Sequence, residues 1–404
     1  MTRIPRPRVI LLVLDGLGVG AMDDVALDRP QDIGANTLKH VAEAVGGLDT
    51  PTLARLGLGC VEHAPGLSLA EPPLASYGRA NLGYHGADSY LGHQALLGTL
   101  PLASEPALMV DAADRIDLAL RQRGHDVARL EGGVLVVDQA VVIADNLEAD
   151  TGQNINLTVA LAQLSFERAL AIGAVVRDLV SVARVIVFGG PELTLDAILA
   201  QLERRPNGQV GINSPALGVY DERLVIRHMG YGVDPARQVA SIAARAGKRV
   251  SLIGKMADLI ACEPATRNPA VSTPAVMRAI LDGTRDDTFD FLAATVQETD
   301  LAGHEGDPAR YAAVLRQADE GIAALLPLLA PRDTLIITAD HGNDPTRATG
   351  KHTREQVPIL IYRPGHPAQP FADRSSLADI GATVAALLGV TATQDGLSIM
   401  NIES

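Results

Sequence analysis

TLIITADHGNDPT, the stretch from Thr334 to Thr346, is the part of this sequence that decides the fold. It begins with a run of β-branched and apolar residues, Thr334–Thr338, and then turns polar at Asp340 and His341. A short apolar run that ends in turn residues is typical of a buried strand. A charged pair is not a usual strand terminator, so the stretch predicts a strand that leads into a functional loop.

Other apolar runs repeat this pattern along the chain, with Ala- and Leu-rich helical stretches between them. Three of the runs lead to an aspartate, namely Asp15, Asp300 and Asp340. The alternation predicts an α/β fold with a largely parallel sheet. Ligands of such sheets gather outside the carboxyl ends of the strands, where all three aspartates are expected. The expected strands are Val9–Leu14, Arg184–Phe188, Val250–Ile253, Phe289–Val296, Thr334–Thr338 and Val357–Tyr362, and the clearest helices are Pro308–Leu328 and Ala378–Leu388.

The length of the chain and the character of its middle part predict two domains. A chain of 404 residues is too long for one ordinary core. In the middle of the chain the elements become shorter and are broken by Gly and Asn, as in Gly152–Asn154. We therefore expect residues 1–101 and 228–404 to form one discontinuous core, and residues 102–227 to form a smaller domain inserted into it.

Composition and charge argue against several classes of function. The formal net charge is −14 and aromatic residues make up only 3% of the chain, so a nucleic acid is not an expected partner. A small phosphate ester is a suitable ligand, because a bound metal can reverse the field locally. The apolar run Val9–Leu14 is too short for a signal peptide core or a membrane span. Cys60 and Cys262 are the only two cysteines, too few for a disulfide framework, so we expect a cytoplasmic protein without a membrane partner.

Residues with metal-binding side chains collect at the predicted strand ends. They are three carboxylates and three imidazoles: Asp15, Asp300, His304, Asp340, His341 and His352. Taken singly, each has a structural interpretation, such as the turn or helix cap that an aspartate before glycine often forms. Their combination at neighbouring strand ends is harder to explain in that way. Mixed carboxylate and imidazole ligands favour Mn, Zn or Fe over Ca or Mg, although Mg is an alternative. Six ligands are enough for two ions about 4 Å apart, the arrangement that clamps a phosphoryl group during in-line displacement.

Ser89 is the candidate nucleophile. It stands where a helix is expected to begin, ahead of the apolar run Ala95–Leu97. Its structural interpretation is a helix N-cap, which stabilises a helix by about 1 kcal/mol. Its functional interpretation uses the same place, because free N–H groups and the positive end of the helix dipole favour a bound phosphate there. A serine hydroxyl on a metal ion is acidified and can attack phosphorus. The sequence leaves both interpretations open.

These residues, in this order, resemble the alkaline-phosphatase superfamily and, more narrowly, the phosphopentomutases. The Asp-Pro-Thr and Thr-Arg-Glu motifs favour phosphopentomutases over phosphoglycerate mutases. The resemblance covers most of the metal-binding core. It implies an alkaline-phosphatase-like core with a mainly parallel sheet flanked by helices, plus an inserted smaller α+β cap domain. The segments that carry it are Leu14–Gly16, Asp32–Leu38, Pro51–Leu53, Leu56–Gly59, Ile253–Asp258, Thr338–Thr346, His352–Glu355 and Ala378–Thr383.

The resemblance also implies roles for individual residues. Ser89 falls at the phosphorylated position and would bridge two metal ions, and Lys255 would lie near the substrate phosphate. The family uses two divalent metals, usually Mn, and works through a phosphoenzyme and a sugar bisphosphate. It interconverts ribose or deoxyribose 1-phosphate and 5-phosphate. The implied metal ligands form two sets of three: Asp15, Asp340 and His341 for one ion, and Asp300, His304 and His352 for the other.

The inserted domain departs from the family pattern, which leaves the substrate open. It lacks a clear Arg-Pro-Phe segment, and Asp150 and Arg227 are the candidates for binding the sugar phosphate. Ser89, and the spacing of Asp300 and His304, are features of phosphoglycerate mutases. The alternatives are therefore a related metal-dependent mutase, acting on phosphoglycerate or another sugar phosphate, and a phosphatase. A metal-bound sugar-phosphate-binding protein without turnover is a further alternative from another class. The oligomeric state does not follow from the sequence.

Overall fold

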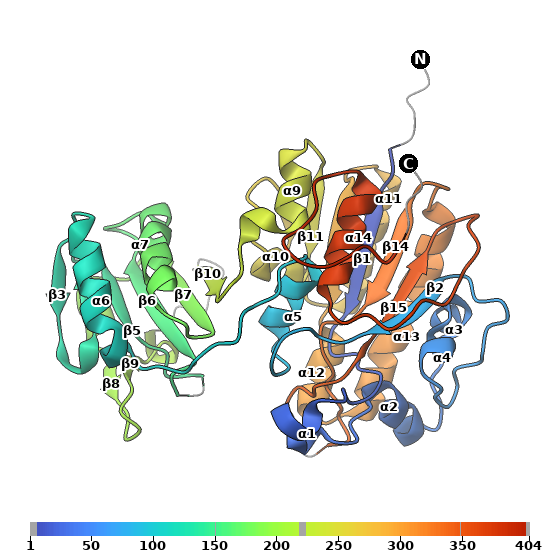
Figure 1. The fold of residues 1–404 in the computed structure, drawn as a ribbon, viewed down its shortest axis with the longest axis horizontal. Helices are drawn as coiled ribbons and strands as arrows, with labels where there is room; N and C mark the ends of the chain where they lie inside the picture. The colour runs from blue at the N-terminus through green and yellow to red at the C-terminus, as the bar shows by residue number, and fades with distance from the viewer. Residues whose placement is uncertain (1–5, 150, 218–223, 348, 401–404) are drawn as a thin grey trace. The chain divides into compact units, whose positions relative to one another are not determined.

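The computed structural model describes residues 6–149, 151–217, 224–347 and 349–400. The chain divides into two compact units (Figure 1). The first is formed by Met1–Leu100 together with Asp234–Ser404, and the second by Pro101–Val233.

Strand pairing decides where the second unit ends. Strand β10 (Val225–Gly230) pairs antiparallel with β7 (Arg184–Gly190) along its whole length. A boundary after Arg227, as expected from the sequence, would cut through this strand and assign its two halves to different units. The division instead falls after Val233.

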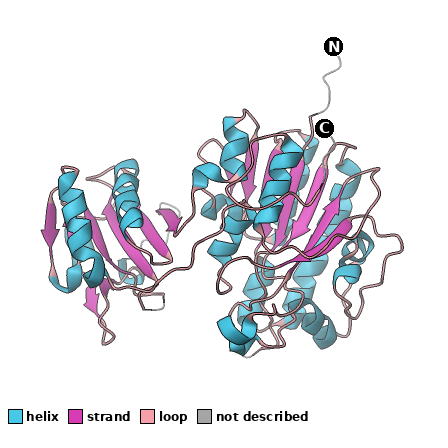
Figure 2. Ribbon diagram, in the orientation of Figure 1, coloured by secondary structure: helices cyan, strands magenta, loops and turns pink. Residues whose placement is uncertain are grey.

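The first unit is built on a seven-stranded sheet with the strand order β12-β11-β13-β1-β14-β15-β2. Figure 2 shows strands in magenta and helices in cyan. Neighbours from β12 to β14 pair in parallel, whereas β15 pairs antiparallel with both β14 and β2. The largely parallel sheet predicted from the sequence is therefore confirmed. Its strands are β1 (Val9–Leu14), β2 (Ser76–Ala80), β11 (Val250–Ile253), β12 (Thr266–Asn268), β13 (Phe291–Val296), β14 (Thr334–Thr338) and β15 (Val357–Tyr362).

Strand β1 lies at the centre of this sheet. All six of its residues are buried, as expected for a parallel strand covered by helices on both faces. It pairs in parallel with β13 on one side, ending at Val296, and with β14 on the other, ending at Thr338. The carboxyl ends of three neighbouring strands thus meet at one edge of the sheet, and the chain continues from them to Asp15, Asp300 and Asp340.

Helices cover both faces of this sheet (Figure 1). On one side α2, α3, α11 and α12 pack around α13, and on the other α14 packs against α5 and α9. Helix α13 begins as its sequence predicts, because Asp307 accepts a hydrogen bond from the Arg310 amide and Pro308 occupies the first helical position. The helices are α1 (Val25–Asp28), α2 (Thr37–Val45), α3 (Pro51–Leu56), α4 (Leu58–Val61), α5 (Ser89–Leu96), α9 (Val239–Arg245), α10 (Lys255–Leu259), α11 (Thr273–Arg285), α12 (Glu298–Glu305), α13 (Pro308–Leu325) and α14 (Ala378–Leu388).

The second unit is an α+β unit with a mixed eight-stranded sheet. Its main path is β10-β7-β6-β5-β4-β3, and of these neighbours only β6 and β7 pair in parallel. Helices α6 and α7 supply an apolar cluster with the sheet, and a second cluster includes residues of α8 and β9. The elements introduced here are α6 (Met109–Gln122), α7 (Phe166–Leu179), α8 (Leu195–Leu199), β3 (Val127–Arg129), β4 (Leu135–Val137), β5 (Val141–Asp145), β6 (Asn154–Ala160), β8 (Leu202–Arg204) and β9 (Val210–Ile212).

Most predicted elements have the predicted bounds. The strand expected from Arg184 to Phe188 continues to Gly190, because β6 pairs with it that far. Two other exceptions have local causes. The strand expected from Phe289 begins at Phe291, because the Asp290 carboxylate is tied to Arg249 by hydrogen bonds of 2.7 and 2.9 Å. The helix expected to reach Leu328 ends at Leu325 and continues as a 3-10 turn, since Pro327 has no N–H for the helical ladder. Within the described residues, no helix is both long enough and apolar enough to span a membrane.

Candidate metal centre

A tight turn after β1 creates the floor of the site. Gly16 follows Asp15 with a φ of +75°, and a Cβ atom there would lie 3.0 Å from the Asn343 Cβ and 3.3 Å from an Asp300 oxygen. The backbone therefore approaches its neighbours too closely for a side chain. The Gly16 amide donates a hydrogen bond of 3.2 Å to Oδ1 of Asp340. In this way the turn fastens the ends of β1 and β14 together.

Asp15, Asp340 and His341 are the first predicted ligand set, which we name the buried group. Their side chains have no exposed surface. Nε2 of His341 lies 3.2 Å from Oδ2 of Asp340 and 3.6 Å from Oδ1 of Asp15. Among the described residues, neither that nitrogen nor Asp15 Oδ1 has a hydrogen-bond partner. Buried polar atoms that face one another without hydrogen bonds are what a cation site requires.

The charges of the buried group show how strongly it favours a positive partner. Burial, and next the nearby charge of Asp340, raise the pKa of Asp15 to about 7. Burial opposes a charge on His341, but the Asp340 carboxylate prevails and raises the pKa of that imidazole to about 10. The group thus binds a proton tightly, and a divalent ion can take the place of that proton. The residues present therefore fit a metal ion.

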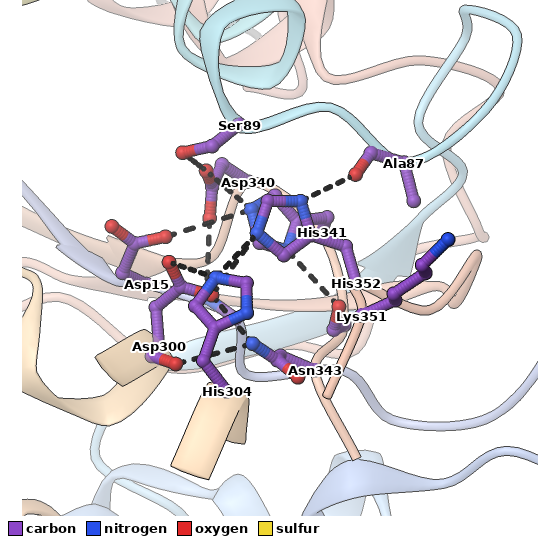
Figure 3. A network of polar contacts seen from close by, with 12 residues as sticks. Asp15, Ala87, Ser89, Asp300, His304, Asp340, His341, Asn343, Lys351 and His352 are labelled. Carbon is purple, nitrogen blue, oxygen red and sulfur yellow. Dashed lines mark hydrogen bonds and ion pairs between the residues drawn. The ribbon is translucent and has the colours of Figure 1, made fainter. Parts of the chain in front are cut away.

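Asp300, His304 and His352 form the second set, which we name the open group. Asp300 and His304 were expected on a loop, but they lie four residues apart on α12, a spacing that puts both on one helical face. Nε2 of His304 is 3.4 Å from Oδ2 of Asp300, and Nε2 of His352 is 3.4 Å from its Oδ1. Nδ1 of each imidazole donates to a carbonyl 2.8 Å away, that of Gly350 or of Ala87. Both Nε2 atoms are thereby left to face the carboxylate, the orientation of metal-ligating histidines (Figure 3).

The two groups touch each other. The ring of His341 stacks on that of His352 with centroids 3.9 Å apart. Atoms suited to a metal also cluster across the expected division, as Asp300 with His341 and His352, within 4.8 Å of one another. The geometry therefore brings all six predicted ligands into one centre, while the division of ligands between ions stays a prediction.

Ser89 faces this centre from the start of α5. The structural interpretation of Ser89 as a helix cap is wrong, because Asp88 is the N-cap and accepts a hydrogen bond of 3.0 Å from the Leu91 amide. Ser89 is the first helical residue, so its hydroxyl is available to the site. Its Oγ donates to Oδ2 of Asp340 over 2.8 Å.

Lys255 stands between the two groups. Its Nζ lies 2.6 Å from Oδ2 of Asp15 and 3.1 Å from Oδ2 of Asp300. It also donates to Oγ of Ser89 over 3.2 Å. Burial disfavours the charge on Lys255, but the neighbouring carboxylates, Asp15 first among them, raise its pKa above the usual range. The ammonium group therefore stays charged next to the candidate nucleophile.

Arg354 and Glu355, which follow His352 closely in the sequence, organise the surrounding loops. From the sequence, neither of them was assigned a role. The buried Glu355 carboxylate accepts hydrogen bonds of 2.6 Å from the hydroxyls of Thr37 and Thr353. Arg354 is bound to Asp24 over 2.7 Å and donates to the carbonyl of Gly86, in the loop that leads to Ser89. These contacts fasten the loop before Ser89 to the loop of the open group. The continuity of the motif from His352 to Glu355 was the signal that could have revealed them.

Three further residues complete the account of the predicted site. His93, which sequence reasoning missed, is buried beside Ser89 and Asp340. Arg227 lies on β10 of the second unit, where it pairs with Val187. Asp150 lies outside the described residues. The sugar-binding roles of Asp150 and Arg227 therefore stay predictions.

Comparisons with known proteins show to which family the chain belongs. A model of the metalloenzyme superfamily matches residues 7–392. A phosphopentomutase of Symbiobacterium thermophilum is 33% identical over 405 residues, which cover 97% of each chain. A phosphopentomutase of Alkaliphilus metalliredigens is 30% identical over 409 residues, again covering 97% of each chain.

A solved structure of Leishmania mexicana phosphoglycerate mutase, obtained at low cobalt concentration, shares the fold. It superimposes with a TM-score of 0.50 and 14% identity, over 100% of this chain and 99% of that one. At 14% identity this structure shows a shared fold only, whereas the sequence matches show the family. The chain therefore belongs to the alkaline-phosphatase-like metalloenzyme superfamily, and within it to the phosphopentomutases, and is an isomerase.

Proposed function

We propose that the chain interconverts ribose or deoxyribose 1-phosphate and 5-phosphate through a phosphorylated Ser89. The observation that carries this proposal is the position of the Ser89 hydroxyl, 2.8 Å from Asp340 and 3.2 Å from the Lys255 ammonium. A hydroxyl held between a carboxylate and a cation is oriented for nucleophilic attack. The proposed reaction is the one that the names of the relatives give, and the Ser89 hydroxyl is the group that would carry the phosphoryl group.

We assign two divalent ions to the centre, one to the buried group and one to the open group. Mn is the metal we favour, with Zn or Mg as alternatives, because the ligands mix carboxylates with imidazoles. When bound, such ions supply positive charge that neutralises the oxygens of a transferring phosphoryl group. The free Cys60 and Cys262 suit a reducing compartment, so we place the enzyme in the cytoplasm.

In the proposed reaction, phospho-Ser89 donates its phosphoryl group to the free hydroxyl of the pentose phosphate. The bond from phosphorus to Oγ breaks, a bond to the sugar oxygen forms, and the sugar hydroxyl proton ends on Oγ. The bisphosphate then turns around and returns its other phosphoryl group to Ser89, so a trace of sugar bisphosphate can prime the enzyme. Lys255 stabilises the negative charge that develops on Oγ, and Asp340 orients the hydroxyl when it is free. Asp150 and Arg227 of the inserted unit are our candidates for holding the distal end of the sugar phosphate.

Phosphorus NMR tests this proposal directly. The enzyme is loaded with Mn and given ribose 1-phosphate with a trace of a sugar 1,6-bisphosphate. We expect the ribose 5-phosphate signal to grow without inorganic phosphate. Release of inorganic phosphate instead would identify a phosphatase. An unchanged spectrum would contradict the choice of substrate and direct the search to other phosphorylated compounds.

A further inference from the structure

His93 is a fully buried imidazole that belongs to neither ligand group. It lies on α5 four residues after Ser89, so both side chains are on the same face of the helix. Its Nδ1 is 2.9 Å from the carbonyl oxygen of Ser89 and 3.0 Å from Oδ2 of Asp340. Its Nε2 is 2.9 Å from the hydroxyl of Thr295 at the end of β13. One ring thus connects the nucleophile, a predicted metal ligand and the sheet.

The neighbours of Nδ1 decide which nitrogen carries the hydrogen. The Ser89 carbonyl and the Asp340 carboxylate can only accept hydrogen bonds. Nδ1 of His93 is therefore protonated, and the Thr295 hydroxyl is the partner of Nε2. His93, Asp15 and Asp340 have ligand atoms close enough to hold a metal ion. Unlike Nε2 of His341, which has no hydrogen-bond partner among the described residues, Nδ1 of His93 is engaged with two oxygens, so we do not count His93 among the predicted ligands.

A close helix approach makes these contacts possible. A Cβ atom on Gly92 would lie 2.5 Å from the Asp340 carbonyl oxygen and 2.9 Å from its Cβ. Only a residue without a side chain allows α5 to pack so closely against the loop after β14. Tyr84 fastens the same junction, because its hydroxyl donates to the Asp340 carbonyl over 3.2 Å. The Ser89 carbonyl and Asp340 thereby come within reach of a single imidazole.

We propose that His93 is a positioning residue for phosphoryl transfer. Its Nδ1–H holds Oδ2 of Asp340 and the first turn of α5 in a fixed relation, and this relation aims the Ser89 hydroxyl. Without it, the Asp340 carboxylate can rotate away from Oγ and the serine loses its orientation. This inference rests on the proposed role of Ser89 as the phosphoryl carrier. It adds a residue that acts through others and touches no substrate atom.

Two substitutions separate the nitrogens of the ring. Asn places its N–H close to where Nδ1 stands, whereas Gln places its N–H close to where Nε2 stands. We expect His93→Asn to keep kcat within about threefold of wild type, because the donor to Asp340 is retained. We expect His93→Gln to lower kcat by about 10- to 100-fold with KM nearly unchanged, the usual effect of losing a group that orients a ligand. The same two substitutions at His125, whose Nδ1 is 2.8 Å from Asp138 in the second unit, are matched controls and should leave kcat unchanged.

Further measurements distinguish positioning from other roles of His93. Metal content after Mn loading should equal that of wild type in both His93 variants, whereas loss of one equivalent in each would show that His93 is a ligand. The melting temperatures should be similar, and equal losses of kcat in His93→Asn and His93→Gln would overturn the proposal. Should both variants fail to fold, the wild-type protein provides the test. Nitrogen-15 NMR of its histidines should show hydrogen on Nδ1 of His93, and a bare Nδ1 would refute the proposal.

The outcomes separate this inference from the proposed function. If the wild type turns over no pentose phosphate, the proposed substrate is wrong, but the NMR assignment and the metal content still test the place of His93. If the wild type is active and phosphorylated on Ser89 by intact mass, while His93→Gln is as active as wild type, only the positioning role is wrong.

Discussion

The buried group and the open group use the same residue types in different surroundings. All three side chains of the buried group are fully enclosed, whereas 40% of the His304 side chain and 21% of the His352 side chain are exposed in the open group. Their aspartates follow neighbouring strands of one sheet. The difference in exposure therefore comes from the segments that cover each group at the edge of the sheet. It predicts that the two bound ions differ in affinity and exchange rate.

The largest effect should come from Ser89, which faces both groups from the start of α5. Ser89→Ala removes the hydroxyl that contacts Asp340 and Lys255. We expect kcat for mutase turnover to fall by about a thousandfold or more, as when other catalytic serines are removed. Calorimetric titration should still detect both Mn sites, because the three predicted ligands of each group remain and only the hydroxyl predicted to bridge the ions is lost. Ser89→Thr keeps a hydroxyl and should retain activity; full turnover by Ser89→Ala would disprove the phosphoserine route.

Replacing one histidine in each group tests whether the two groups bind metal with unequal affinity. His341→Ala takes a ligand from the buried group and should weaken one Mn site by at least about 100-fold, more than the loss of an outer-shell partner causes. His304→Ala should weaken the other site by a smaller factor, because water can fill its exposed position. Titration calorimetry and dialysis against a chelator measure both effects. Equal losses in the two variants would show that burial does not set the affinity.

The pH dependence of metal binding should also differ between the groups. The His341 imidazole, with its pKa raised to about 10, carries a proton at neutral pH that a bound ion must expel. Binding at the buried group should therefore strengthen as pH rises, by about tenfold per pH unit for each proton released. In the open group the shifts oppose one another, because burial, and next the charge of His341, lower the pKa of His352, whereas the hydrogen bond to Asp300 raises the pKa of His304. In the buried group the pKa values of Asp15 and His341 are both raised, so more protons have to be expelled there. Mn titrations from pH 6 to 8 should thus give a steeper slope for the tighter site, and parallel slopes would contradict this difference.

The smallest effect is expected at the helix cap next to the nucleophile. Asp88→Ala removes the acceptor for the Leu91 amide and should lower the free energy of unfolding by about 1 kcal/mol. Both Mn affinities should stay unchanged, because Asp88 belongs to neither group. Denaturant unfolding measures the loss, and Asp88→Asn, which preserves the cap, is the control. A change in metal affinity would mean that the cap, and not only Ser89, supports the centre.

Much of the fold could be predicted because its signals are local. The six apolar residues of β1 indicate a strand buried on both faces, and the structure has that strand with the same bounds. The largely parallel order of the core follows from the alternation of strands and helices. The boundary of the inserted unit was less accessible, since it depends on β10 pairing with a strand about forty residues earlier.

The candidate site was predictable in residue types and less so in roles. Asp15, Asp340 and His341 stand just after strands, so a short stretch of sequence is enough to predict their position at the strand ends. The helical position of His304 follows from its spacing to Asp300, but apolar periodicity is weak there. The sequence around His93 does not indicate that Gly92 allows α5 to pack closely against Asp340. Asp88 and Ser89 are both good caps, and the choice between them needed three-dimensional contacts.

The sequence by itself determined the architecture of the core and the family, and it supplied the residues predicted as metal ligands. These properties depend on apolar runs and on motifs whose residues are close along the chain. Only the tertiary structure decided that Asp88 caps α5 and frees Ser89, that Lys255 stands among the carboxylates, and that one ligand group is covered while the other is open. Each of these outcomes depends on distances between segments far apart in sequence, and the packing of the sheet edge sets those distances.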